Sequence, residues 1–130
     1  MLDGLKIIDA SSVLAGPSVA TYFAELGAHV TKVEHPENPD VTRSWKLPSE
    51  DKNSPVSAYF SSVNYGKSYT KLDLNLDEDH SKFIEMISTA DVLIMNFKRS
   101  DYQKFNIEDH QLLKFNPRLI IGKINGYGEN

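Results

Sequence analysis

The fold is decided by residues 5–34, LKIIDASSVLAGPSVATYFAELGAHVTKVE, in which two short apolar runs flank one amphipathic segment. The first run, Leu5–Asp9, predicts a buried strand, and the second, His29–Glu34, predicts another. Between them, Pro17 stands in a first helical turn and Gly27 just past a helix end. Strand, helix and strand in 30 residues form a βαβ unit, in which a right-handed crossover joins two parallel strands.

The alternation of strands and helices continues along the rest of the chain. The expected elements are a helix over Val56–Val63, a strand over Tyr69–Leu74, a helix from Asp77, a strand over Asp91–Phe97, a polar helical segment and a strand over Arg118–Ile124. Residues 35–56 hold four of the six prolines and lack periodicity, which predicts a long surface loop. The sequence therefore predicts the α/β class, with an open, mostly parallel Rossmann-like sheet and flanking helices.

Helical periodicity also predicts which side chains of the helices face the core. In the first helix the expected buried face consists of Val19, Tyr22, Phe23 and Leu26. In the polar helical segment the expected buried residues are Ile107, Leu112, Leu113 and Phe115.

Composition excludes several classes of function. A chain of 130 residues has the usual size of one domain, so a single domain over residues 1–130 is expected. With 14 basic and 18 acidic residues, the formal net charge of -4 disfavours nucleic acid as a partner. The absence of cysteine excludes disulfides and zinc-finger sites. No signal-peptide pattern or bilayer-spanning run is found, so we expect a cytoplasmic protein without a membrane partner.

The predicted topology also indicates where a ligand binds. In a sheet of order 3-2-1-4-5, ligands lie beyond the carboxyl ends of the strands where the order reverses, between the first and fourth strands. The two loops at that point are Ser11–Pro17 and the segment Asn96–Arg99. Free N–H groups at the following helix N-terminus favour an anion, and Lys98 and Arg99 add positive charge. These features predict a phosphate-bearing ligand.

A dinucleotide is the alternative that this pattern leaves open. Glu34 ends the second strand where the ribose-binding acid of a Rossmann fingerprint stands. The loop SSVLAGPS has a single glycine, however, so it lacks the G-x-G-x-x-G pattern that lets backbone approach a pyrophosphate. The four histidines have no metal-ligand spacing, and no metal is expected.

Seven motifs together resemble the class III CoA-transferases, in order and across nearly the whole chain. They are LxGLKIID with VLAGP (2–17), AELGAHVTKVE (24–34), DVTRSW (40–45), AYFSSVNYGK (58–67), LDL (72–74), ADVLIMNF (90–97) and NPRLIIGKINGYGE (116–129). The family includes formyl-CoA:oxalate and carnitine CoA-transferases, and 2-methylacyl-CoA racemase is a relative. Where the family has an NRGK-type turn this chain reads NYGK, so Tyr65 replaces a basic residue and Lys67 is retained.

The resemblance implies an N-terminal coenzyme-A-binding domain of a longer chain that forms an interlocked homodimer. Its coenzyme A contacts, carried over motif by motif, fall on Val13, Leu14, Ala15, His35, Lys71, Leu72, Asn96 and Phe97, with Lys98 and Arg99 beside them. The ligands implied are an acyl-CoA and a small carboxylic acid.

The chemistry implied is nucleophilic catalysis by a carboxylate. In the transferases an aspartate attacks the acyl-CoA thioester, and the acceptor acid completes the exchange through covalent intermediates. The matching aspartate lies beyond the NGYGE motif, so no residue of this chain is expected to be catalytic. The 130 residues by themselves are expected to bind coenzyme A at most. The sequence leaves a racemase-type enzyme and a non-catalytic nucleotide-binding or interaction module open as alternatives.

Overall fold

A computed structural model describes residues 1–128 and shows a five-stranded, wholly parallel sheet. The strands are β1 (Lys6–Ala10), β2 (His29–Glu34), β3 (Ser68–Lys71), β4 (Val92–Met95) and β5 (Ile120–Lys123). Their order is β3-β2-β1-β4-β5, with Ile8 opposite Thr31 on one side and Leu93 on the other. The α/β class and the predicted strand order are therefore confirmed.

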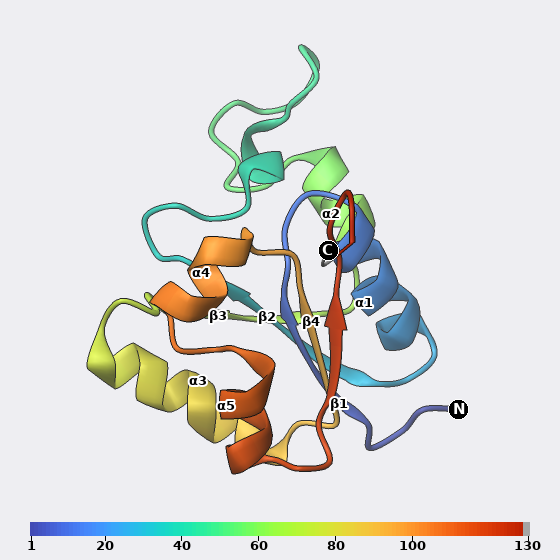
Figure 1. Ribbon diagram of the computed structural model, residues 1–130. Coiled ribbons are helices and arrows are strands. Elements are labelled where there is room, and N and C mark those ends of the chain that lie inside the picture. The colour runs from blue at the N-terminus through green and yellow to red at the C-terminus, as the bar shows by residue number, and fades with distance from the viewer. Residues whose placement is uncertain (129–130) are drawn as a thin grey trace.

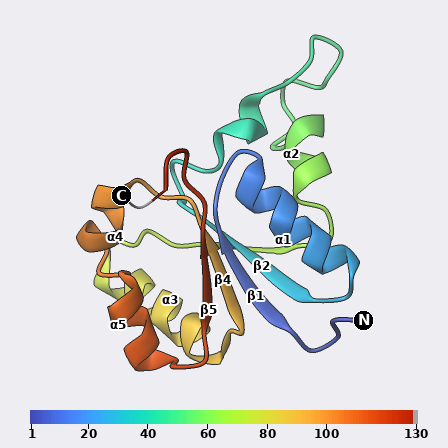
Figure 2. The same cartoon turned by 45° about the vertical axis from the view of Figure 1, so that its right-hand side comes forward.

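The helices cover both faces of this sheet. They are α1 (Ala15–Glu25), the 3₁₀ helix η1 (Val41–Ser44), α2 (Ala58–Val63), α3 (Asp77–Thr89), α4 (Arg99–Lys104) and α5 (Asp109–Phe115). Figure 1 shows α1 and α2 on one side of the sheet and α3, α4 and α5 on the other, and Figure 2 shows the same three layers from a second direction. The expected polar helical segment is two helices, because Asn106 adopts a left-handed φ of 52° between them.

Each face of the sheet has its own apolar core. Ile8, Leu93 and Met95 belong to the core with Phe83 and Ile87 of α3. On the opposite face, Ile7, Val30 and Ile94 pack with Ala20 of α1. Successive strand residues thus enter different cores, as expected of a parallel sheet that is buried on both sides.

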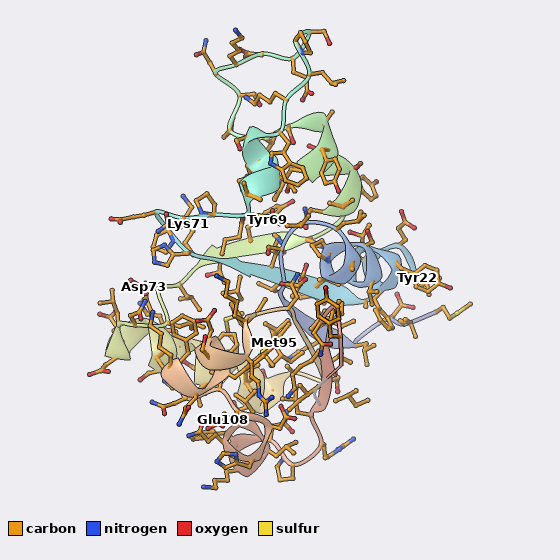
Figure 3. All side chains as sticks on the ribbon, turned by 45° about the horizontal axis from the view of Figure 1, so that its top comes forward. Tyr22, Tyr69, Lys71, Asp73, Met95 and Glu108 are labelled. Atoms are coloured by element: carbon orange, nitrogen blue, oxygen red, sulfur yellow. The ribbon has the colours of Figure 1, made fainter. Side chains whose placement is uncertain are left out.

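The buried face predicted for α1 is wrong for two of its four residues, since Phe23 and Leu26 are half-buried. Phe23 packs against the core, but Val19 and Tyr22 are exposed, and Figure 3 shows Tyr22 projecting away from the molecule. The buried residues of α1 are Gly16, Pro17, Ala20 and Thr21. Small side chains allow the helix to lie close to the sheet, so the larger side chains of the helix turn outward.

Two further burial predictions, both in the C-terminal third, are also wrong. Ile107 and Leu112 are fully buried as expected, whereas Leu113 and Phe115 are exposed. The predicted helical periodicity assumed one continuous helix. The separate helix α5 has only two turns and presents Leu112 to the core, so its other apolar residues face outward.

The long segment after β2 projects from the sheet, as Figures 1 and 2 show. Its base is packed down by Trp45, whose ring meets Tyr59 edge-on with centroids 5.3 Å apart. Arg43 stacks its guanidinium 3.8 Å from the centre of the Phe60 ring. Within residues 1–128, no helix has the length and apolar character needed to cross a bilayer.

Candidate functional site

A cleft of about 400 Å³ opens at the carboxyl ends of the strands. Its walls come from the ends of β1, β2 and β4 and from the segments that follow them, with Leu72 to Leu74 after β3. This is the position at which the strand order reverses, where open α/β sheets bind their ligands. The fold therefore places a cleft where the sequence predicted one.

Half of the ten predicted ligand contacts line this cleft. They are His35, Leu72, Asn96, Phe97 and Lys98. Val13, Leu14, Ala15, Lys71 and Arg99 do not line it. Figure 3 shows Lys71 and Asp73 together at the end of β3, with Lys71 exposed and Asp73 in the cleft lining.

Charge in the cleft differs from the sequence prediction. Of the two predicted cations, Lys98 lines the cleft, whereas Arg99 lines a second cleft of about 410 Å³ together with Tyr102 and Lys123. Arg99 and Lys98 diverge because α4 begins between them. Asp73 and Asp101 also line the first cleft, so its walls carry both signs of charge.

The loop between β1 and α1 does not present its first amides to a ligand. The N–H of Ser11 donates to Asp9 Oδ1 at 3.0 Å, and that of Ser12 donates to Asn96 Oδ1 at 2.9 Å. The N–H of Val13 donates to the Asp40 carboxylate at 3.1 and 3.3 Å. Each N–H is held by a side chain of the protein, so residues 11–13 have no free amide for an anion. The helix N-terminus, where free amides are expected, begins after them at Ala15.

Asn96 has a structural function that the sequence prediction missed. Besides accepting from the Ser12 N–H, it donates from Nδ2 to the Ser12 carbonyl at 2.8 Å. This pair of hydrogen bonds joins the end of β4 to the loop after β1, across the point of strand-order reversal. Asn96 therefore both lines the cleft and fixes its neighbouring wall.

Two buried lysines and two buried aspartates lie directly beneath the loop. The Lys67 ammonium donates to Asp9 Oδ2, to the Pro17 carbonyl and to Asn64 Oδ1, each at 2.8 Å. Lys32 Nζ lies 3.1 Å from Asp40 Oδ2 and donates to the Ser11 carbonyl at 2.7 Å. All four charged side chains are at most 1% exposed.

These environments lower the pKa of both Lys67 and Asp40, which disfavours the charged form of the lysine and favours the charged form of the aspartate. Burial lowers the pKa of Lys67, and the nearby Asp9 opposes that shift. Burial acts to raise the pKa of Asp40, but hydrogen bonds from Thr42 and the charge of Lys32 outweigh it, so this pKa lies below its ordinary value. Asp40 is therefore held as a carboxylate able to accept from the loop.

The Lys–Asp network was not found by sequence reasoning, although two signals were available. Lys32 interrupts an otherwise core-facing strand, and a buried lysine requires anionic partners. Lys67 is the residue retained in the NYGK turn. Neither signal names the partner, because Asp9 and Lys67 are 58 positions apart.

Glu34 is not available as the ribose-binding acid of a dinucleotide site. Arg43 holds both of its oxygens, with Nε donating to Oε1 at 2.9 Å and Nη2 to Oε2 at 2.6 Å, and the Asp40 N–H also donates to Oε1. Burial alone would raise its pKa, but these donors and the Arg43 charge lower it. The carboxylate is bound within the protein, which removes the feature that favoured the dinucleotide alternative.

His35 and Phe97 form two further parts of the cleft. His35 Nδ1 accepts from the N–H groups of Glu37 and Asn38, so its ring donates only through Nε2, which lies 3.4 Å from Asp73 Oδ2.

Phe97 is half-buried and meets Tyr102 and Phe105 edge-on, both with centroids 5.9 Å away. Phe97 lines both clefts, so it is at once a core residue and a wall residue.

No metal centre is assembled within residues 1–128, where no three or more histidine, aspartate or glutamate side chains are placed to hold an ion. The fold and the cleft define a Rossmann-like α/β domain with an open cleft beyond the carboxyl edge of its sheet. Its particular family follows from comparison with known proteins.

The sequence profile of CoA-transferase family III matches residues 2–130, and the chain belongs to that family. It is 38% identical over 128 residues to succinyl-CoA:mesaconate CoA-transferase of Haloarcula hispanica, covering 98% of this chain and 32% of that protein. It is 39% identical over 127 residues to acetyl-CoA:oxalate CoA-transferase of Acetobacter aceti, with 98% and 32% covered. The chain thus spans about a third of the length of these relatives.

Solved structures agree with this assignment. A CaiB/BaiF family protein from Brucella suis superposes with a TM-score of 0.92 at 37% identity, covering 99% of this chain and 34% of that one. The resemblance stated from the seven motifs is confirmed. The last motif extends to Glu129, which lies outside the described residues. The racemase alternative is not favoured, because the relatives above are named as CoA-transferases.

Proposed function

We propose that these 130 residues are the coenzyme-A-binding domain of a CoA-transferase that moves coenzyme A between an acyl-CoA and a small carboxylic acid. The observation that carries the proposal is the cleft at the point of strand-order reversal, lined by His35, Leu72, Asn96, Phe97 and Lys98. Leu72 belongs to the LDL motif and Asn96 and Phe97 to the ADVLIMNF motif, while His35 and Lys98 each directly follow the end of a motif. The transferase names of the relatives support the proposed reaction.

The cleft offers groups that suit different parts of coenzyme A. Leu72 and Phe97 supply apolar surface for a planar or aliphatic portion. Lys98 is exposed at the rim, where an ammonium can pair with a phosphate without losing its own hydration. We include in the proposed ligand contacts the loop residues Val13, Leu14 and Ala15, and Lys71 and Arg99, which lie outside the cleft itself.

Replacing Lys98 tests the site. We expect Lys98→Ala to weaken coenzyme A binding by about two- to five-fold, the loss typical of one exposed ion pair. The exposed Lys6, at the opposite end of β1, provides the matched control: Lys6→Ala should bind as the parent does. Calorimetric titration gives the affinities. Amide shifts during the titration should move around residues 35, 72 and 96–98, and shifts confined to the opposite edge of the sheet would contradict the proposal.

The proposal also predicts that the 130 residues alone transfer no coenzyme A. Transfer needs a carboxylate within bonding reach of the thioester carbonyl and donors for the developing oxyanion. Asp9 and Asp40 are buried in ion pairs, and the family pattern matches none of the aspartates here to the nucleophile. Incubation with formyl-, succinyl- or acetyl-CoA and a panel of acids, followed by chromatography, should show no exchange. Exchange abolished by replacing Asp73 or Asp101 would overturn this assignment.

Homodimer formation and a cytoplasmic location belong to the same proposal. Exposed apolar side chains support an assembly that covers more surface than this domain does alone: Tyr22 is 61% exposed and Leu14 is 50% exposed. The absence of cysteine fits a reducing compartment.

A further inference from the structure

Val13 has an unusual backbone conformation for its residue type. Its φ is 71°, in the left-handed region, and the only other non-glycine residue with a positive φ in residues 1–128 is Asn106. Asparagine tolerates this region, whereas a β-branched residue does so only at a cost of about 1–3 kcal/mol. Something in the surrounding structure must therefore hold Val13 in place.

Asp40 is the group that holds it. Both of its carboxylate oxygens accept from the Val13 N–H, at 3.1 and 3.3 Å. Asp40 is itself fixed by the N–H and hydroxyl of Thr42, at 3.1 and 2.7 Å, and by Lys32 Nζ at 3.1 Å. The Asp40 side chain is 1% exposed, so water does not compete with its carboxylate for the Val13 N–H.

The strained residue lies next to the cleft wall. Ser11 and Ser12, immediately before Val13, line the cleft together with Asp40. Lys32 also donates to the Ser11 carbonyl, so the ion pair with Asp40 restrains the loop at two points. A change in the Val13 φ would rotate the peptide that joins it to Ser12 and so displace this wall.

We propose that Asp40 is a positioning residue for ligand binding: by holding Val13 in the left-handed conformation, it sets the cleft wall formed by Ser11 and Ser12. The proposal rests on the proposed function, with coenzyme A as the ligand. Asp40 acts through the backbone of Val13. The strain at Val13 is maintained because the loop shape that it produces is the one that fits the ligand.

Rescue by glycine tests this mechanism, because glycine enters the left-handed region without steric cost. We expect Asp40→Asn to weaken coenzyme A binding about ten-fold, and Asp40→Asn with Val13→Gly to bind within about three-fold of the parent. A role for Asp40 in stability alone predicts that the double variant regains binding only as far as it regains melting temperature, so both are measured for each variant. Asp77→Asn is the matched control, since it makes the same change at an exposed aspartate of α3 that lines neither cleft, and it should bind coenzyme A as the parent does. A double variant as weak as Asp40→Asn overturns the proposal.

Amide exchange tests the same contact without any ligand. The Val13 N–H should exchange with solvent at least about ten-fold faster in Asp40→Asn than in the parent, because its acceptor is weakened. Equal exchange rates would show that Asp40 does not hold this amide. If the parent bound no coenzyme A while Val13 exchange still depended on Asp40, the proposed function would fail and the loop restraint would stand.

A variant that keeps Asp40 tests the strain at Val13 even if Asp40→Asn fails to fold. Val13→Gly in the parent relieves the strain, so its melting temperature should rise by about 3 °C. Val19→Gly, which removes an exposed valine from helix α1, should lower it. A fall in melting temperature for Val13→Gly as large as that for Val19→Gly would show that no strain is stored at Val13 and would overturn the proposal.

Discussion

Lys67→Met is expected to destabilise the protein by about 3–5 kcal/mol, the loss typical when one partner of a buried ion pair is removed. The Lys67 ammonium is fully buried, and its N–H groups have four acceptors within hydrogen-bonding distance: Asp9, Asn64 and the carbonyls of Pro17 and Val63. Methionine fills most of the volume but donates nothing. Asp9 would then keep a buried charge whose other cation, Lys32, stands 4.0 Å away. Denaturant unfolding followed by circular dichroism measures the loss.

Two further variants distinguish the stability lost with the Lys67–Asp9 ion pair from the stability lost with any lysine side chain. Lys6→Met, at an exposed lysine, should change stability by less than about 0.5 kcal/mol. Adding Asp9→Asn to Lys67→Met removes the stranded charge and keeps an acceptor for the Ser11 N–H, so the double variant should be more stable than additivity predicts. Strict additivity of the two single variants would mean that Asp9 and Lys67 do not stabilise each other.

Gly16→Ala is expected to destabilise the protein by about 2–3 kcal/mol, although alanine is the better helix former. Gly16 lies in α1 where the helix meets the loop, and an added Cβ would overlap the Cβ and Oγ of Ser11. Ser11 cannot move aside cheaply, because its N–H and hydroxyl both donate to Asp9 and its carbonyl accepts from Lys32. Thermal and denaturant unfolding of the variant measures the effect, and Gly16→Val should lose more.

Removing the Ser11 side chain should abolish the loss of stability caused by Gly16→Ala. In a Ser11→Gly background the overlap is gone, so Gly16→Ala should become neutral or stabilising by up to about 1 kcal/mol, as helix propensity alone predicts. Gly126→Ala, where an added Cβ meets nothing within 4 Å, is the control and should change stability little. A loss for Gly16→Ala that persists in the Ser11→Gly background would place the cause elsewhere than in this contact.

Both predictions concern the region that shapes the cleft. Lys67, Asp9 and Ser11 form a continuous set of contacts from the turn before β3 to the loop after β1. Lys32 and Asp40 continue it to Val13. The cleft wall is thus built on buried charges, and partial losses of stability and of ligand affinity should occur together in variants of this network.

The sequence by itself determined the fold class, the order of elements and the family. Apolar runs of strand length, with Pro17 and Gly27 bounding a helix, act locally, so they can be read without knowing what each segment packs against. The position of the cleft followed from the doubly wound strand order 3-2-1-4-5, which was assumed for this fold class and which the structure has. Five of the ten contacts that the family resemblance implied line this cleft.

Only the tertiary structure decided which groups face the cleft and which face inward. The amides of residues 11–13 are occupied by Asp9, Asn96 and Asp40, and the last two of these acceptors lie 84 and 27 positions from their donors. The outward turn of Val19 and Tyr22 likewise depends on how closely α1 approaches the sheet. Periodicity and motif spacing describe neighbours along the chain, whereas hydrogen-bond partners, ion pairs and helix rotation are set by distances that exist only after the sheet has formed.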